Sequence, residues 1–137
     1  MTYEMFLQEV RQRTGLTSNL ESVDAARAVL QTFFECLPGV LACEVASHLP
    51  CALRSDFRYR EQNPGERLTV TEFLLHVAER EGVTDATAFC HSQAVFQMLG
   101  ASLGLELLER VRVELPMEFD EFWGTDPAHV HMHQSVA

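Results

Sequence analysis

This sequence of 137 residues contains no Lys and no Ile, and all ten of its basic residues are Arg. Against them stand 20 Asp and Glu residues, which give a net charge of −10. The deficit of positive charge is greatest in residues 68–137, where three Arg face eleven acids. Because binding to nucleic acid depends on neutralising phosphates with Lys and Arg, this balance argues against general nucleic-acid binding.

Long apolar runs are also missing. Charged residues interrupt every hydrophobic stretch before it reaches the ~20 residues that a membrane span needs, so we expect no membrane association. The first 14 residues carry Glu4, Glu9, Arg11 and Arg13 amid apolar residues. They lack the basic start and apolar middle of a signal peptide. We therefore expect a cytoplasmic protein.

The four cysteines do not form a C-x-x-C pair; they are Cys36, Cys43, Cys51 and Cys90. In the cytosol they should be thiols, and most should pack as small hydrophobic residues. A glycine-rich phosphate loop, a nucleophile elbow, an H-E-x-x-H motif and zinc-finger spacing are all absent. The sequence therefore predicts no catalytic and no cofactor-binding residues, and we expect a protein that is not an enzyme.

What the chain does contain is an internal repeat. Phe6, Val10 and Gly15 recur 67 residues later, at Phe73, Val77 and Gly82. After the loss of one residue the offset becomes 66, and the matched pairs are then Val29/Val95, Leu41/Leu107, Leu49/Leu115 and Pro50/Pro116. These positions are mostly apolar, Gly or Pro, so the repeat specifies packing and chain reversal rather than chemistry.

Each copy has helical periodicity. In the first, Ala26, Val29, Leu30, Phe33 and Leu37 keep the spacing of one helical face, and Pro50 either stops the third helix or starts a short fourth one through Phe57. Capping-box patterns precede two helices, in residues 18–21 and 69–72. Only residues 105–115 suggest a strand, because Val111, Val113 and Leu115 alternate with charged residues, but the first copy keeps helical spacing there.

The predicted fold is therefore all-α, a helical bundle of two similar three-to-four-helix repeats related by pseudo-two-fold symmetry. We expect a single domain over residues 1–125. Repeat one covers residues 3–57, a linker follows over residues 58–68, and repeat two covers residues 69–123. Residues 126–137 form a His-containing tail outside the repeat, which we expect to be disordered in part.

Three segments carry a family resemblance: residues 72–83 (EFLLHVAEREGV), His91 ahead of Ala94 and Val95, and residues 111–119 (VRVELPMEF). In their order and repetition they resemble the bacterial family catalogued as domain of unknown function 2267, over residues 3–123. The resemblance implies an all-helical bundle of two similar halves and supplies no catalytic residues. The chain departs from the family on residues 40–49, which carry one formal charge where members usually carry acids and bases.

The tail holds His129, His131 and His133 at alternate positions. In an extended chain such imidazoles point to one side and can converge on Zn²⁺, Ni²⁺ or Cu²⁺, with Glu118, Glu121 or Asp126 completing the ligand set. The alternative is a polar tail that binds metals only weakly, and an enclosed site would need rigid geometry and a second shell of hydrogen bonds. We expect no other cofactor.

Two further groups have structural explanations beside functional ones. Cys90 and His91 diverge by about 100° on a helix, so their side chains cannot pair with each other, although Cys90 could meet His76. The alternative is that Cys90 is a packed thiol and that His91 makes a buried hydrogen bond between the halves.

The only basic stretch consists of Arg54, Arg58, Arg60 and Arg67 with Phe57 and Tyr59. Interleaved acids favour a solvated linker there over a phosphate site.

The third helix of the first repeat is apolar on more than one face, so it must be covered on more than one side. We expect Ala42, Cys43 and Ala46 to line a homodimer contact, unless the second repeat covers them. The function predicted from the sequence is thus a non-enzymatic interaction or adaptor module that acts as a homodimer or binds an unidentified protein. The alternative is a small-ligand or metal-binding protein that uses the inter-repeat groove or the His tail.

Overall fold

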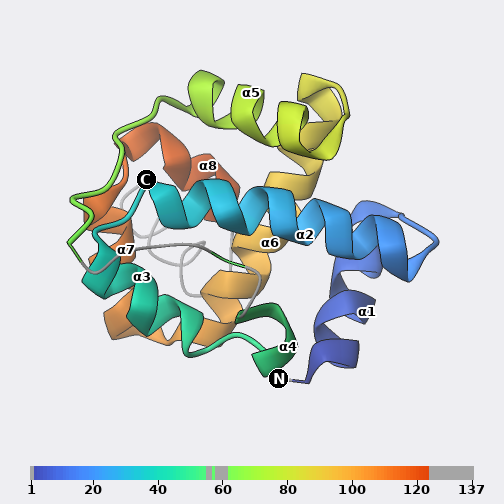
Figure 1. The fold of residues 1–137 in the computed structure, drawn as a ribbon, viewed down its shortest axis with the longest axis horizontal. Coiled ribbons are helices and arrows are strands. Elements are labelled where there is room, and N and C mark those ends of the chain that lie inside the picture. The colour runs from blue at the N-terminus through green and yellow to red at the C-terminus, as the bar shows by residue number, and fades with distance from the viewer. Residues whose placement is uncertain (1, 55–56, 58–61, 124–137) are drawn as a thin grey trace, which may run out of the picture.

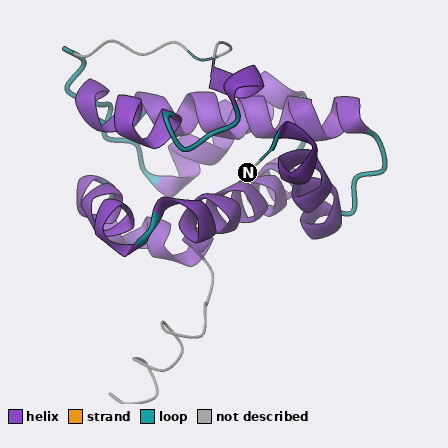
Figure 2. Ribbon diagram, turned by 90° about the horizontal axis from the view of Figure 1, so that it is seen from below, coloured by secondary structure: helices purple, strands orange, loops and turns teal. Residues whose placement is uncertain are grey.

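The computed structural model describes residues 2–54, 57 and 62–123, and this part of the chain consists of helices and loops without a strand (Figures 1 and 2). The helices are α1 (Tyr3–Thr14), α2 (Asn19–Glu35), α3 (Gly39–Ala46), α4 (Cys51–Arg54), α5 (Val70–Glu81), α6 (Asp85–Leu103), α7 (Leu105–Glu114), the 3₁₀ turn η1 (Met117–Phe119) and α8 (Asp120–Trp123). The all-helical prediction is confirmed for these residues. None of their helices combines the length and the apolar character that crossing a membrane requires.

Each half of the chain has a first helix, a longer second helix, a third helix and a short terminal one. The two-fold relation between the halves stays a prediction. Of the two alternatives at Pro50, the structure has the short fourth helix, described over Cys51–Arg54, and Phe57 is not helical. Residues 105–114 are helical, and the strand-like alternation ends with Leu115 in an extended conformation.

Side-chain caps begin the main helices as the sequence predicts. The Thr69 hydroxyl accepts from the Glu72 amide at 3.1 Å, and the Glu72 carboxylate accepts from the Thr69 amide at 2.9 Å, which completes a capping box. At α2 the Ser18 hydroxyl likewise accepts from the Glu21 amide, but the Glu21 carboxylate meets the hydroxyl of Ser18 instead of its amide. Gly82 then ends α5 in the left-handed conformation, at φ 77°.

The two long helices pack across the halves. α2 lies against α5 of the second half, and α6 lies against α1 of the first (Figure 1). Arg13 and Arg80 lie 67 residues apart, at the offset of the repeat, and both bond across the halves. Arg13 on α1 donates to Gln97 on α6 at 2.7 Å, and Arg80 on α5 donates to Glu35 on α2 at 2.9 Å. Each half thus contributes its longest helix to the core of the other.

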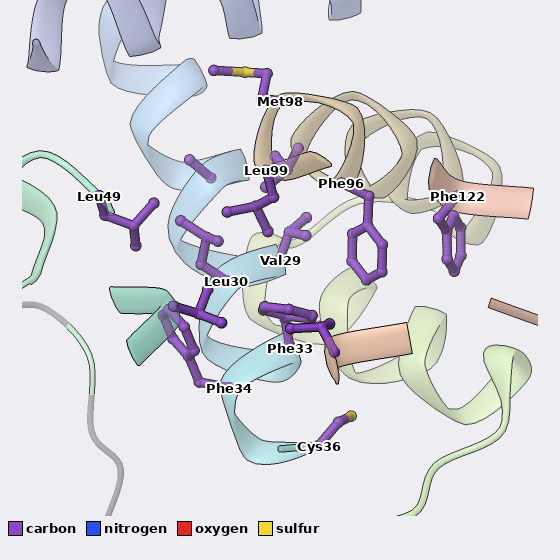
Figure 3. Close-up of a cluster of buried hydrophobic side chains, with 14 of the residues drawn as sticks. Val29, Leu30, Phe33, Phe34, Cys36, Leu49, Phe96, Met98, Leu99 and Phe122 are labelled. Atoms are coloured by element: carbon purple, nitrogen blue, oxygen red, sulfur yellow. The ribbon is translucent and has the colours of Figure 1, made fainter. Parts of the chain in front are cut away.

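The centre of the core is aromatic. Phe33 on α2 lies edge-on to Phe96 on α6 with ring centroids 5.2 Å apart (Figure 3). The ring of Phe96 also lies 4.8 Å from that of Trp123 on α8. Phe73 on α5 meets Phe96 and Phe119, each nearly at right angles. Such edge-to-face pairs add about 0.5–1.5 kcal/mol each beyond the burial of their area.

The segment before α5 is held to the end of α2. The Gly39 amide donates to the Asn63 carbonyl and the Glu66 amide to the Glu35 carbonyl, both at 2.8 Å. Gly65 lies between these bonds at φ 89°, and a Cβ there would stand 2.9 Å from the backbone oxygen of Cys36. Only Gly combines this φ with this close approach, so the turn places α5 across α2.

Candidate functional site

The residues predicted to line a dimer contact are mostly inside the fold. Ala42 and Ala46 on α3 belong to the hydrophobic core, while Cys43, between them in the sequence, is half-buried. Ala42 and Ala46 are therefore covered by the chain itself. Of the three residues, only Cys43 is accessible to a second molecule, so the predicted contact surface is smaller than expected. The homodimer itself stays a prediction.

An ion pair joins α3 to α7 at this end of the molecule. Arg110 on α7 donates to both carboxylate oxygens of Glu44, at 2.7 and 3.0 Å. This hydrogen bonding holds the pKa of Glu44 below its usual range. Because the folded state lowers the pKa, the pair contributes at neutral pH, and its contribution is lost as pH falls below the ordinary carboxyl value. The negative charge of the Glu44 carboxylate thereby offsets the positive charge of Arg110.

The outer face of α7 carries an apolar feature that sequence reasoning missed. Leu105 is 74% exposed, Val113 is 76% exposed and Met117, just beyond the helix, is 84% exposed. With the exposed Glu109 they recur every fourth residue, and we call these four residues the α7 stripe. The alternation at Val111, Val113 and Leu115 was its signal, because Val111 and Leu115 are buried and Val113 is not.

Acidic side chains surround the α7 stripe. Residues 105–123 contain six acids and two Arg. Arg112 is only 17% exposed, with Asp120 at 3.3 Å and Glu109 at 4.0 Å, and Arg110 bonds to Glu44. Both positive charges therefore face acids of this chain, and the surface around the stripe presents a negative field to its surroundings.

A groove of about 410 Å³ lies between α2 and α5, at the boundary of the two halves. Charged, polar and apolar residues line it: Asp24, Arg27, Ala28, Gln31, Phe57, Arg80 and Glu81. Arg80 is held in place by hydrogen bonds to Thr32 and Glu35, each at 2.9 Å. The volume falls within the range of small-molecule sites, and the use of an inter-repeat groove for ligand binding stays a prediction.

His91 forms a buried pair at the edge of this groove. Its Nδ1–H donates to the carboxylate of Glu81, with the two oxygens at 2.8 and 2.7 Å, and the side chains are 5% and 6% exposed. The expected buried hydrogen bond is therefore present, but it joins α5 to α6 within the second half rather than one half to the other. Cys90 lies next to it on the exposed side of α6.

Part of the basic stretch has structural roles. Arg54 donates to the Leu49 carbonyl at 3.0 Å and to the Cys51 sulfur at 2.9 Å, while Phe57 packs edge-on against Phe34 with centroids 5.2 Å apart. Arg58, Tyr59 and Arg60 lie outside the described residues. The residues that can be placed thus stabilise the α4 region and the core.

The predicted metal ligands His129, His131 and His133, and Asp126 beside them, lie outside the described residues. Of the other proposed ligands, Glu118 accepts a hydrogen bond from the Val70 amide at 2.7 Å and so helps to hold the start of α5. Within residues 2–54, 57 and 62–123, no three His, Cys, Asp or Glu residues gather as a metal site. The metal site of the tail stays a prediction.

Cys36 should be the least reactive thiol of this chain. Burial, followed by the carboxylates of Glu66 and Glu35, raises the pKa of Cys36 to about 12. At roughly pH 8, iodoacetamide should label the exposed Cys51 and Cys90 within minutes and leave Cys36 unlabelled until denaturant unfolds the protein, as peptide mass mapping would measure. Labelling of Cys36 at the rate of Cys90 in the folded protein would contradict its burial.

The same shift has a consequence for stability. An unfolded thiol ionises near its model value of 9.0, while Cys36 in the folded chain stays protonated. The free energy of unfolding should therefore fall as the pH rises from 9.0 towards 12.

Two comparisons bear on the identity of this fold. The family model described as an uncharacterized conserved protein, DUF2267, matches residues 3–122, which is nearly the whole of the described chain. No curated protein matches the sequence. The family resemblance noted in the sequence is confirmed, and it assigns no activity to any residue described above.

Proposed function

The chain belongs to the conserved family of domain of unknown function 2267, and we propose that it is a non-enzymatic interaction module that binds another protein through the outer face of α7. The observation that carries this proposal is the α7 stripe, where Leu105, Val113 and Met117 are all more than 70% exposed. Single exposed apolar residues are normal on a soluble protein. Here three lie on one broad face of α7 and just beyond its end, and we take them as the apolar part of a surface that another molecule covers.

A photo-crosslinking side chain tests this proposal. Placed at Val113 in the native host, it should give one discrete protein adduct, and the same group at Leu20, which is 72% exposed at the start of α2, should not. Adding Met117→Glu should abolish the Val113 adduct, because a charge would then enter the apolar contact. Equal adducts at both positions, or an adduct indifferent to Met117→Glu, would remove the basis for the proposal.

We also propose the homodimer as a candidate form of this module, now with Val40 and Cys43 as its contact residues. Val40 is 59% exposed, one helical turn from the half-buried Cys43. Because Ala46 is buried, an Arg there would disturb the core, and Cys43→Arg is the cleaner variant. Light scattering at tens of micromolar should give a dimer for the wild type and a monomer for this variant. A monomeric wild type would contradict the homodimer.

Small-ligand binding is the second candidate function, and the α2–α5 groove favours it. The groove brings two guanidinium groups, two carboxylates and the ring of Phe57 around about 410 Å³. A ligand of this site should raise the melting temperature of the wild type in a thermal-shift screen and have no effect on an Arg80→Met variant. The metal-binding function of His129, His131 and His133 remains a proposal of the same class, for the tail.

A further inference from the structure

We infer that the partner of the α7 stripe is a basic amphipathic helix, an inference that rests on the proposed function and names the class of its partner. The apolar part of the surface sets the shape of that partner. From Leu105 to Val113 the helix rises about 12 Å, and the two side chains lie about 80° apart around its axis. They therefore share one broad face of α7, which Met117 extends beyond the helix end.

A second helix fits this spacing. A helix packs against another helix when the side-chain rows of one enter the grooves between the rows of the other. Two turns of contact require apolar residues at the i, i+3 or i+4, and i+7 positions of the partner. An amphipathic helix supplies that pattern on one face and leaves the other face polar.

The charge of the surface selects the sign of the partner. Glu106, Glu109 and Glu114 are exposed on α7 beside the apolar side chains, and Glu118 and Glu121 follow them. The two arginines of this region bond to Glu44 and Asp120 of the same chain. A partner that carries Lys or Arg beside its apolar stripe would meet this negative field with complementary charge.

The same charges disfavour a second copy of this chain on the α7 stripe. A two-fold contact would place the acids of one α7 against those of the other, and like charges across an interface cost affinity. The chain has a net charge of −10, so the repulsion would extend beyond the contact itself. A basic helix avoids both penalties, which is why we assign it rather than self-association to this face.

A synthetic helix provides the probe. A fluorescent peptide of about 18 residues, roughly five turns, would carry Leu on one face and Lys elsewhere. Its matched control keeps every Leu and replaces each Lys with Glu. Fluorescence anisotropy with the full chain should give a micromolar dissociation constant for the Lys peptide and at least about tenfold weaker binding for the Glu peptide. Raising the salt concentration from about 50 to about 300 mM should weaken the binding of the Lys peptide several-fold.

Surface variants then locate the contact. Val113→Ser should weaken the Lys peptide about tenfold, and Glu109→Lys should do the same through charge. Leu20→Ser and Glu21→Lys are the matched controls, since Leu20 and Glu21 are exposed on α2 and should leave binding unchanged. All four positions are exposed, and a circular-dichroism melt verifies that each variant folds. If one α7 variant fails to fold, the other decides the result.

Equal binding of the two peptides, no binding of the Lys peptide, or equal losses in the α2 controls would each overturn the assignment of a basic helix. The crosslinking experiment tests the proposed function separately from the class of partner. A specific Val113 adduct together with no affinity for the Lys peptide would retain the interaction module and reject this class of partner. Crosslinking of one copy to another through Val113 would instead identify self-association on the α7 stripe.

Discussion

Replacing Phe33 with Ala should lower the free energy of unfolding by about 3–5 kcal/mol, because it removes a fully buried ring from the place where the two halves meet. Phe33 lies 5.2 Å from the ring of Phe96 and 6.4 Å from that of Trp123. The loss therefore includes the transfer free energy of the ring, the cavity left behind and two edge-on aromatic contacts. For a chain of this size the melting temperature should fall by roughly 10–15 °C.

Urea unfolding at constant slope measures this loss, and two variants control it. Phe33→Leu keeps much of the volume and should cost clearly less than Phe33→Ala. Leu20→Ala, on the surface, should change stability by no more than about 0.5 kcal/mol. A cost for Phe33→Ala below about 1 kcal/mol would mean that α2 does not pack on α6 as described.

Replacing His91 with Leu should cost about 3–5 kcal/mol, because it leaves the carboxylate of Glu81 in a buried place without its donor. The two carboxylate oxygens lie 2.8 and 2.7 Å from Nδ1 of His91, and only 6% of the Glu81 side chain is exposed. The pair fixes the end of α5 against α6. Its loss should also loosen the α2–α5 groove, which Glu81 lines.

A double-mutant cycle separates the charge from the packing. Replacing both residues, Glu81→Leu with His91→Leu, should cost less than His91→Leu alone, because no unpaired charge is then buried. Denaturant unfolding of the four proteins at neutral pH gives the coupling energy directly. A cost for His91→Leu below about 1 kcal/mol would show that Glu81 turns into solvent instead of staying buried.

Predictions from local pattern agree with the structure wherever the signal is local. The spacing of Ala26, Val29 and Phe33 marks the buried face of α2, and all three residues are buried. Thr69 with Glu72 forms the capping box that their separation suggests. Helical periodicity and caps arise from neighbours within one or two turns, so the chain carries this information in short segments.

The candidate sites were less predictable because burial is decided by residues far apart in the chain. Ala42 and Ala46 could equally have faced another molecule, until packing within the chain covered them. The partner of His91 lies ten residues earlier, across the Gly82 turn, and becomes a neighbour only when α5 packs on α6. The exposure of Val113 likewise depends on which side of α7 meets the core.

The sequence by itself determined that this protein is built from helices in two similar runs, that it is strongly acidic, and that it belongs to its family. Only the tertiary structure decided which half supplies each neighbour: α2 lies on α5, α6 lies on α1, and the outer face of α7 is left with three apolar side chains uncovered. The physical reason is that a period of 3.6 residues identifies an apolar face without naming what covers it. That choice depends on the packing of the whole chain, to which the Gly65 turn contributes by holding the segment before α5 at the end of α2.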